Sequence, residues 1–144
     1  MGIKRIFLAI VVLSIACVNQ KELSLDHHEY ISFGSLGGFA GSFREFRIYP
    51  DGNAFKRTKY NGDFTKQKKI DQRRVDQFYV LVDQMRKEGL SINESGNVSY
   101  FIKWVKKNNT RIEVIWNDNI TVDEKLPLLY QSMKKSCSDE FSVR

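Results

Sequence analysis

The sequence predicts an α+β fold in which an antiparallel β-sheet of hairpins carries two helices on one face. Two observations lead to this expectation. Several short segments alternate apolar and polar residues and are separated by turn residues, as in strands that pair as hairpins. Two longer segments repeat apolar residues with the spacing of an amphipathic helix. Their order along the chain is βββ-α-ββ-α, which is typical of helices segregated to one face of a sheet.

The first three strands are predicted within residues 30–60. Residues 30–33 are mostly aromatic or β-branched and predict a strand, whereas residues 34–41 hold four glycines and predict a loop. Residues 43–49 predict the second strand. The string Pro50-Asp51-Gly52-Asn53 is typical of a tight turn, so residues 54–60 are expected to return as the third strand.

The strongest helical pattern lies between Asp71 and Gly89. Its apolar residues recur with helical spacing, at Val75, Phe78, Tyr79, Leu81, Val82 and Met85. Asp71 is expected to be the N-cap. Gly89, followed by Leu90, is expected to end the helix as a C′ glycine.

A second hairpin is predicted after a loop at residues 93–97. Apolar and other residues alternate along residues 98–105 and 112–116, on either side of a turn at residues 106–109. Because the outer face of both strands is partly apolar, we expect them to be central in the sheet or covered at one end.

The second helix is predicted from about Thr121 to Lys135. Thr121 and Glu124 have the spacing of a capping box, and an apolar stripe follows them. Pro127 is tolerated only in the first turn of a helix. The regular helix is therefore expected either to begin nearer Lys125 or to be kinked at the proline.

Composition limits the class of the protein. The chain has 144 residues, of which 42% are hydrophobic, and this suits one domain with an apolar core and excludes disordered or collagen-like chains. Two cysteines cannot form a disulfide-dense scaffold, and no Cys/His cluster has the spacing of a structural zinc site. Lys and Arg number 23 against 17 Asp and Glu, so the formal net charge is +6.

The N-terminal segment predicts export. Two basic residues precede an apolar run at residues 6–16, which has the length of a secretory signal and is shorter than the ~20 residues of a membrane-spanning helix. Cys17 directly follows Ala16, as in a bacterial lipoprotein signal, although Ser14 stands where such signals prefer leucine. We therefore expect residues 1–16 to be removed and Cys17 to be lipidated.

This interpretation defines the organisation of the chain. Residues 17–29 would form a spacer, residues 30–135 a single α+β domain and residues 136–144 a polar tail. The protein would be exported and held at the membrane of the bacterial cell envelope by the lipid on Cys17. Two alternatives remain: an ordinary signal peptide cut nearby, which leaves a plain thiol, or a Cys17–Cys137 disulfide. Otherwise Cys137, which has no histidine nearby in the sequence, is expected to be a buried or idle thiol.

No residue pattern predicts catalysis. The metalloprotease, serine-hydrolase and P-loop motifs do not occur in the sequence. His27 and His28 are adjacent and lack a third ligand, so we expect them in a solvated linker. The carboxylates Asp118, Asp123 and Glu124 lack the spacing of a calcium loop. We therefore expect a protein that is not an enzyme and that uses no metal and no cofactor.

The basic residues form two groups in the sequence. They are Lys66, Lys68, Lys69, Arg73 and Arg74, near the start of the first helix, and Lys103, Lys106, Lys107 and Arg111, around the second hairpin turn. Positive charge can attract nucleic acid, but export argues against that partner, so we expect no nucleic acid. We expect a solvated face, with attraction to an anionic membrane or an acidic partner as the alternative.

The string Gly37-Gly38-Phe39-Ala40-Gly41 places one large apolar side chain among residues that have almost none. Glycine lets the backbone take a positive φ or approach another surface closely. We expect either a structural bulge, with Phe39 in the core, or an interaction loop that presents Phe39 to a partner.

This string, the Pro127-x-Leu129-Tyr130 sequence and the order of the elements resemble the emfourin family over residues 31–133. Emfourins are small protein inhibitors of thermolysin-like metalloproteases. The resemblance implies that the loop from Ser35 to Ser42 meets a metalloprotease and excludes substrate noncovalently. It assigns partner binding to Gly37, Gly38, Phe39, Ala40, Gly41 and Arg44. The alternative is a noncatalytic envelope lipoprotein that binds another envelope component or an anionic surface through its basic residues.

Overall fold

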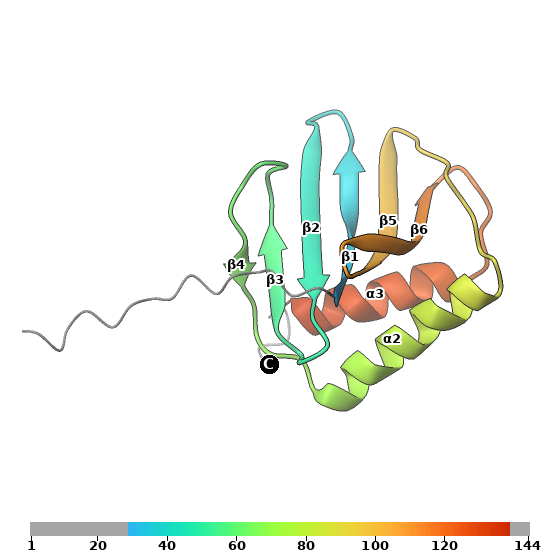
Figure 1. Ribbon diagram of the computed structural model, residues 1–144. Coiled ribbons are helices and arrows are strands. Elements are labelled where there is room, and N and C mark those ends of the chain that lie inside the picture. Colours follow the sequence, from blue (N-terminus) through green and yellow to red (C-terminus); the bar gives the residue numbers. More distant parts are fainter. Residues whose placement is uncertain (1–28, 139–144) are drawn as a thin grey trace, which may run out of the picture.

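The computed structural model of the protein describes residues 29–138. One antiparallel sheet contains β1 (Glu29–Gly37), β2 (Ser42–Ile48), β3 (Ala54–Arg57), β4 (Thr65–Lys66), β5 (Val98–Lys106) and β6 (Asn109–Asn117), in the order β4-β3-β2-β1-β5-β6. The helices α2 (Gln72–Lys87) and α3 (Lys125–Cys137) both cover one face of this sheet (Figure 1). The α+β class and the order βββ-α-ββ-α are therefore confirmed. The structure adds the two-residue β4 and ends the third strand at Arg57 rather than at residue 60.

The core lies between the two helices and the sheet face that they cover. The sheet contributes mainly Ile31, Phe33, Phe46, Ile48, Ile102, Val114 and Trp116. The helices contribute Val75, Phe78, Val82, Met85, Leu126, Leu129, Tyr130, Met133 and Cys137. The ring of Tyr130 meets Phe33 and Trp116 edge-on, with centroids 5.9 Å and 5.7 Å apart. Burial of these apolar side chains is the main force that holds the helices on the sheet.

The glycine-rich segment differs from the prediction. β1 continues through Gly34 to Gly37, so the loop predicted over residues 34–41 is wrong for its first half. A Cβ atom at Gly34 would lie 1.9 Å from the carbonyl oxygen of Arg44 in β2. Gly34 is therefore a strand residue, and glycine is needed there because the backbones of two strands approach closely. It does not indicate a turn.

The two ends of α2 match the prediction. The Asp71 side chain accepts a hydrogen bond from the amide of Arg73 at 3.1 Å, which confirms the N-cap. At the other end Gly89 has a φ of 72°, and the amide of Leu90 donates to the carbonyl of Met85 at 3.0 Å. This is the hydrogen-bond pattern of a Schellman motif, with glycine at C′.

The start of α3 corrects the predicted capping box. The regular helix begins at Lys125, so Thr121 lies outside it, and the N-cap residue Glu124 makes no side-chain capping bond. Instead, the carboxylate of Asp123 accepts a hydrogen bond from the amide of Lys125 at 2.9 Å. Pro127 falls in the first turn, where its missing N–H costs no helical hydrogen bond. Of the two alternatives, a helix that begins near Lys125 is therefore confirmed, and a helix kinked at Pro127 is not found.

The second hairpin places β6 at an edge of the sheet. Its turn runs through Lys107 and Asn108, whose φ values of 51° and 59° are those of a two-residue turn with the twist that hairpins prefer. Of the two alternatives for these strands, β5 is central, whereas β6 is an edge strand that another segment covers in part. Its free edge is partly covered by residues 92–94, because the amide of Ile115 donates to Ile92 and its carbonyl accepts from Glu94, both at 2.9 Å.

Several sequence expectations fall outside the described range. These are the signal at residues 1–16, the lipidation site Cys17 and the His27-His28 pair. Cys137 is described: its side chain is 1% exposed, it forms no disulfide within residues 29–138, and burial raises the pKa of its thiol to about 12. Within residues 29–138, no helix combines the length and the apolar character needed to cross a membrane.

Candidate functional site

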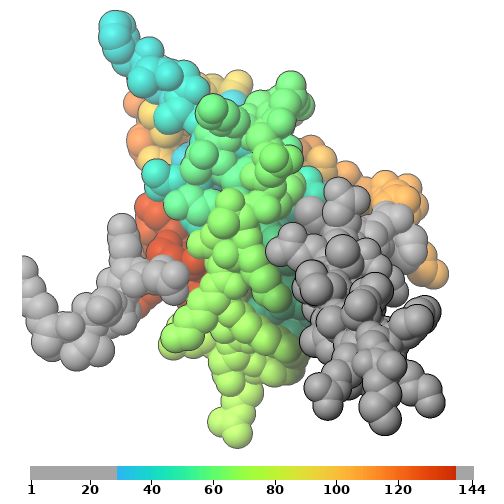
Figure 2. Space-filling view, turned by 90° about the vertical axis from the view of Figure 1, so that its left-hand side faces the viewer, coloured from blue at the N-terminus to red at the C-terminus, as the bar shows by residue number. Residues whose placement is uncertain are grey.

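The turn between β1 and β2 projects from one end of the sheet. It is the cyan projection at the upper left of Figure 2, which shows it standing clear of the rest of the molecule. The side chain of Phe39 at its tip is fully exposed. The alternative in which Phe39 fills the core is therefore wrong, and the string forms an exposed loop.

The backbone at the base of this turn is held by hydrogen bonds on both sides. The amide of Gly38 donates to the carbonyl of Asn97 at 2.5 Å, and the hydroxyl of Ser42 donates to the carbonyl of Gly37 at 2.9 Å. Gly37, Gly38 and Gly41 have φ values of 103°, 82° and 57°, which L side chains rarely adopt. The glycines therefore build a defined turn, and this turn fixes the direction in which Phe39 points.

Apolar side chains continue from the turn onto the sheet face that the helices leave uncovered. Leu36, Phe43, Tyr60 and Phe101 help to line a shallow hollow of about 260 Å³ on this face. The rings of Phe43 and Tyr60 meet edge-on with centroids 5.6 Å apart, and Leu36 and Tyr60 are exposed. A partner that receives Phe39 would find a partly apolar surface beside it.

A buried carboxylate lies on the same uncovered face. Glu45 accepts hydrogen bonds from the Ser32 hydroxyl at 2.8 Å, from Arg47 Nε at 2.9 Å and from Arg57 Nε at 2.6 Å. Burial opposes ionisation of Glu45, but the hydrogen bonds from Ser32 and Arg47 and the charge of Arg47 outweigh it and lower its pKa. Glu45 is therefore an ionised group with a structural role and is not poised as a general acid or base.

Aromatic rings hold the two arginines of this cluster in place. The guanidinium of Arg47 lies 4.6 Å from the ring centroid of Tyr30 and 4.3 Å from that of Phe64. The guanidinium of Arg57 lies 4.8 Å from the Phe64 centroid. Such cation–π contacts favour fixed guanidinium positions. This cluster was not predicted from the sequence, although residues two apart in a strand, such as Glu45 and Arg47 in β2, point to the same face.

Arg44 does not join the exposed loop. It lies opposite Ser35 in the β1–β2 register, on the sheet side that faces the helices. On that side the charge of Arg44 affects Tyr130 of α3. Burial raises the pKa of Tyr130, whereas its hydrogen bond with Ser35 and the nearby charge of Arg44 lower it. The structure therefore brings Gly37 to Gly41 together in one turn and places Arg44 on another face.

The carboxylates weighed in the sequence make local contacts. Asp118 accepts a hydrogen bond from the Tyr100 hydroxyl at 3.2 Å, and Asp123 caps α3. Among residues 29–138, no group of three or more His, Cys, Asp or Glu side chains could hold a metal ion.

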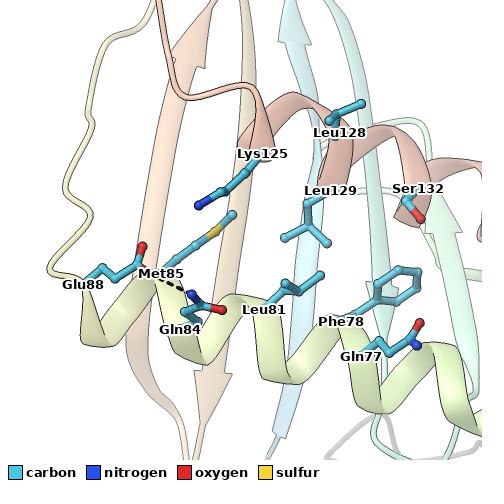
Figure 3. Close-up of a pocket in the computed structure, with 10 residues that line it drawn as sticks. All are labelled: Gln77, Phe78, Leu81, Gln84, Met85, Glu88, Lys125, Leu128, Leu129 and Ser132. Carbon is cyan, nitrogen blue, oxygen red and sulfur yellow. Dashed lines mark hydrogen bonds between the residues drawn. The ribbon is translucent and has the colours of Figure 1, made fainter.

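A groove of about 380 Å³ runs between the outer sides of the two helices. Figure 3 shows Phe78, Leu81 and Met85 from α2 facing Leu129 from α3 across it, whereas Leu128 points away from α2. At its border, Gln84 donates a hydrogen bond to Glu88 at 2.9 Å. The groove therefore offers mainly apolar contact.

The two basic groups predicted from the sequence have different surroundings. In the second group, Lys103 pairs with Glu113 at 3.5 Å and Lys106 pairs with Glu29 at 3.2 Å. In the first group, neither Lys68 nor Lys69 forms an ion pair with any part of the chain that the structure describes. The positive charge is therefore less compensated near the start of α2.

Comparison of the chain with protein-family models, with curated proteins and with solved structures finds no match. The function must therefore be argued from the geometry of the exposed turn and from the chemistry of the surfaces around it.

Proposed function

We propose that the protein is an exported, noncatalytic binding domain that inserts Phe39 into a cleft of a partner protein. The observation that carries this proposal is the full exposure of Phe39 on a turn whose backbone is hydrogen-bonded at its base. Exposed large apolar side chains on fixed loops are typical anchors of protein interfaces.

The energetics favour insertion of this turn. Burying a phenylalanine side chain is worth about 1.5–3 kcal/mol. Since three glycines and their hydrogen bonds already define the turn, little conformational entropy is lost when a partner binds it. The partly apolar face beside the turn, with Leu36, Phe43 and Tyr60, would contact the rim of the cleft.

A thermolysin-like metalloprotease is the proposed partner class, because the resemblance to emfourins implies it. The mechanism would be steric and noncovalent. The turn would occupy the cleft that otherwise takes the substrate, and no residue of this chain would need to react. Gly37 and Gly38 would allow the backbone to come close to the protease surface.

Attachment to the cell envelope through Cys17 is part of the same proposal and is supported by the signal pattern of residues 1–17. β1 begins at Glu29 and leads directly to Gly37, at the base of the turn. A tether that enters at Glu29 would therefore meet the domain at the end opposite Phe39. This arrangement leaves the turn pointing away from the anchor.

The test is to titrate the purified full-length chain against a thermolysin-like metalloprotease while cleavage of a peptide substrate is followed. We expect inhibition that weakens by about tenfold to hundredfold in Phe39→Ala, which corresponds to the loss of one buried phenylalanine. Leu128→Ala removes an exposed apolar side chain from α3 and should leave inhibition unchanged. Inhibition should also depend little on salt, unlike binding through basic residues.

No inhibition by the folded chain would eliminate this partner class. Inhibition that Phe39→Ala leaves intact would show that another surface meets the protease.

A further inference from the structure

Basic side chains converge on a hollow at the end of the molecule opposite Phe39. The hollow has a volume of about 330 Å³ and is bordered by Lys68, Lys69, Arg74 and Lys135. A hydrogen bond holds the segment at its border next to the β2–β3 turn: the amide of Ile70 donates to the carbonyl of Gly52 at 2.9 Å. That turn lies beside the beginning of β1, since Ile48 pairs with Ile31.

Three cations at this hollow, Lys68, Lys69 and Arg74, form no ion pair with any residue that the structure describes. The one carboxylate at the border, Asp71, accepts the amide hydrogen of Arg73 as the helix cap. The hollow therefore carries a local excess of positive charge.

Contacts across the hollow join its two sides. Arg74 Nη1 donates to the hydroxyl of Ser136 at 3.3 Å, which holds the guanidinium between the start of α2 and the end of α3. The side chains of Lys68 and Lys69 are exposed and come from the segment that precedes α2. Cations from three segments thus face one space that a small ligand could fill.

The placement of these cations is unfavourable without a counter-ion. The first turn of α2 contains no acidic residue, and Arg73 and Arg74 occupy it. Cations near a helix N-terminus are repelled by the positive end of the helix dipole. An anion in the hollow would offset both this repulsion and the mutual repulsion of the lysines.

We propose that this hollow binds a phosphate group. A phosphate group combines one or two negative charges with several acceptor oxygens and forms charge-assisted hydrogen bonds with arginine and lysine. Soluble phosphate compounds and the headgroups of anionic lipids both carry such a group, and the lysine and arginine side chains at the hollow would bind either in the same way. The site is independent of the Phe39 turn, so its test does not depend on the proposed inhibition.

The first experiment follows amide shifts of the full-length chain by NMR during titration with inorganic phosphate, with chloride keeping the ionic strength constant. We expect saturable shifts confined to residues 68–74 and 135–138. The double variant Lys69→Gln/Arg74→Gln should raise the apparent dissociation constant by about tenfold or more. The charge-matched variant Lys107→Gln/Arg111→Gln, in the other basic group, should leave it unchanged. Unsaturable shifts that are equal at both basic groups would overturn the proposal.

The second experiment separates the two sources of phosphate. Sedimentation with vesicles of phosphatidylcholine alone is compared with sedimentation with equal parts phosphatidylcholine and phosphatidylglycerol. A preference for the anionic vesicles that is lost in Lys69→Gln/Arg74→Gln and kept in the matched control assigns the site to lipid headgroups. Saturable phosphate binding without this preference assigns it to a soluble phosphate compound. The absence of both results would overturn the proposal, and Phe39→Ala should change neither.

Discussion

Replacing Glu45 with glutamine should destabilise the domain, although Glu45 lies on the sheet face opposite α2 and α3. The substitution keeps the size of the side chain and removes its negative charge. It leaves the guanidinium groups of Arg47 and Arg57 held against aromatic rings, without the carboxylate that now accepts from both.

The size of the effect follows from the exposure of the three side chains. Glu45 is 7% exposed, whereas Arg47 and Arg57 are 21% and 19% exposed. Removing one partner of a fully buried ion pair costs about 3–5 kcal/mol. Because both arginines keep some contact with water, we expect about 2–3 kcal/mol for Glu45→Gln. With a denaturant slope of about 1–3 kcal/mol per molar urea, the midpoint of urea unfolding should fall by about 0.7–3 M.

The pH dependence gives a second readout. The pKa of Glu45 in the folded protein is lowered from the reference value of 4.5. A carboxyl group with a lowered folded pKa stabilises the protein above its unfolded pKa and loses this contribution as the pH falls through the folded pKa. The difference in unfolding free energy between the wild type and Glu45→Gln should therefore be full at about pH 7 and shrink below about pH 4.

Asp83→Asn is the matched control for this substitution. Asp83 pairs with Arg86 at 2.8 Å and with Lys87 at 2.7 Å on the exposed side of α2, where water screens the charges. Its urea midpoint should stay close to that of the wild type. A stabilising role for the Glu45 carboxylate is refuted if Glu45→Gln shifts the midpoint no further than this control, or if its effect is the same at acid and neutral pH.

Three further outcomes follow from the structure. Gly89→Ala should lower the free energy of unfolding by about 1–2 kcal/mol, because Gly89 has a positive φ. Gly37→Ala should lower it by more, because Gly37 also has a positive φ and a Cβ atom there would lie 2.2 Å from the Asn97 carbonyl oxygen. Urea unfolding of both variants compares the two effects. Cys137 should resist alkylation at neutral pH in the folded protein and react once urea unfolds it, as followed by mass spectrometry of the peptide that contains it. Asp71→Ala should cost about 1 kcal/mol through loss of the α2 cap, and an unchanged thermal midpoint would contradict that role.

Local signals predicted much of the fold. The limits of α2 follow from a capping aspartate, a helical apolar period and a C′ glycine, all of which act within a few residues. The second hairpin follows from alternation on either side of a short polar turn. These features depend on neighbouring residues only, so the sequence around each of them contains the whole signal.

Contacts between distant residues explain what could not be predicted. Gly34 belongs to a strand because the backbone of β2 passes close to it, and that approach is set by the register of two strands. The cluster around Glu45 needs Arg57, which β3 brings opposite it. The exposure of Phe39 likewise depends on where the turn lies relative to the core. Its composition alone fitted a buried plug and an exposed anchor equally well.

The course of β1 has a mechanical consequence. β1 leads from Glu29, the first residue that the structure describes, to Gly37, at the base of the turn that carries Phe39. A strand rises about 3.3 Å per residue, which is close to the maximum extension of a polypeptide, about 3.3–3.6 Å per residue. Tension between an anchored N-terminus and a partner that grips the turn would run along this one segment, which has almost no slack to release. The helices and the other strands would lie outside the path of the force, so the domain could be pulled between its two attachments without being drawn open.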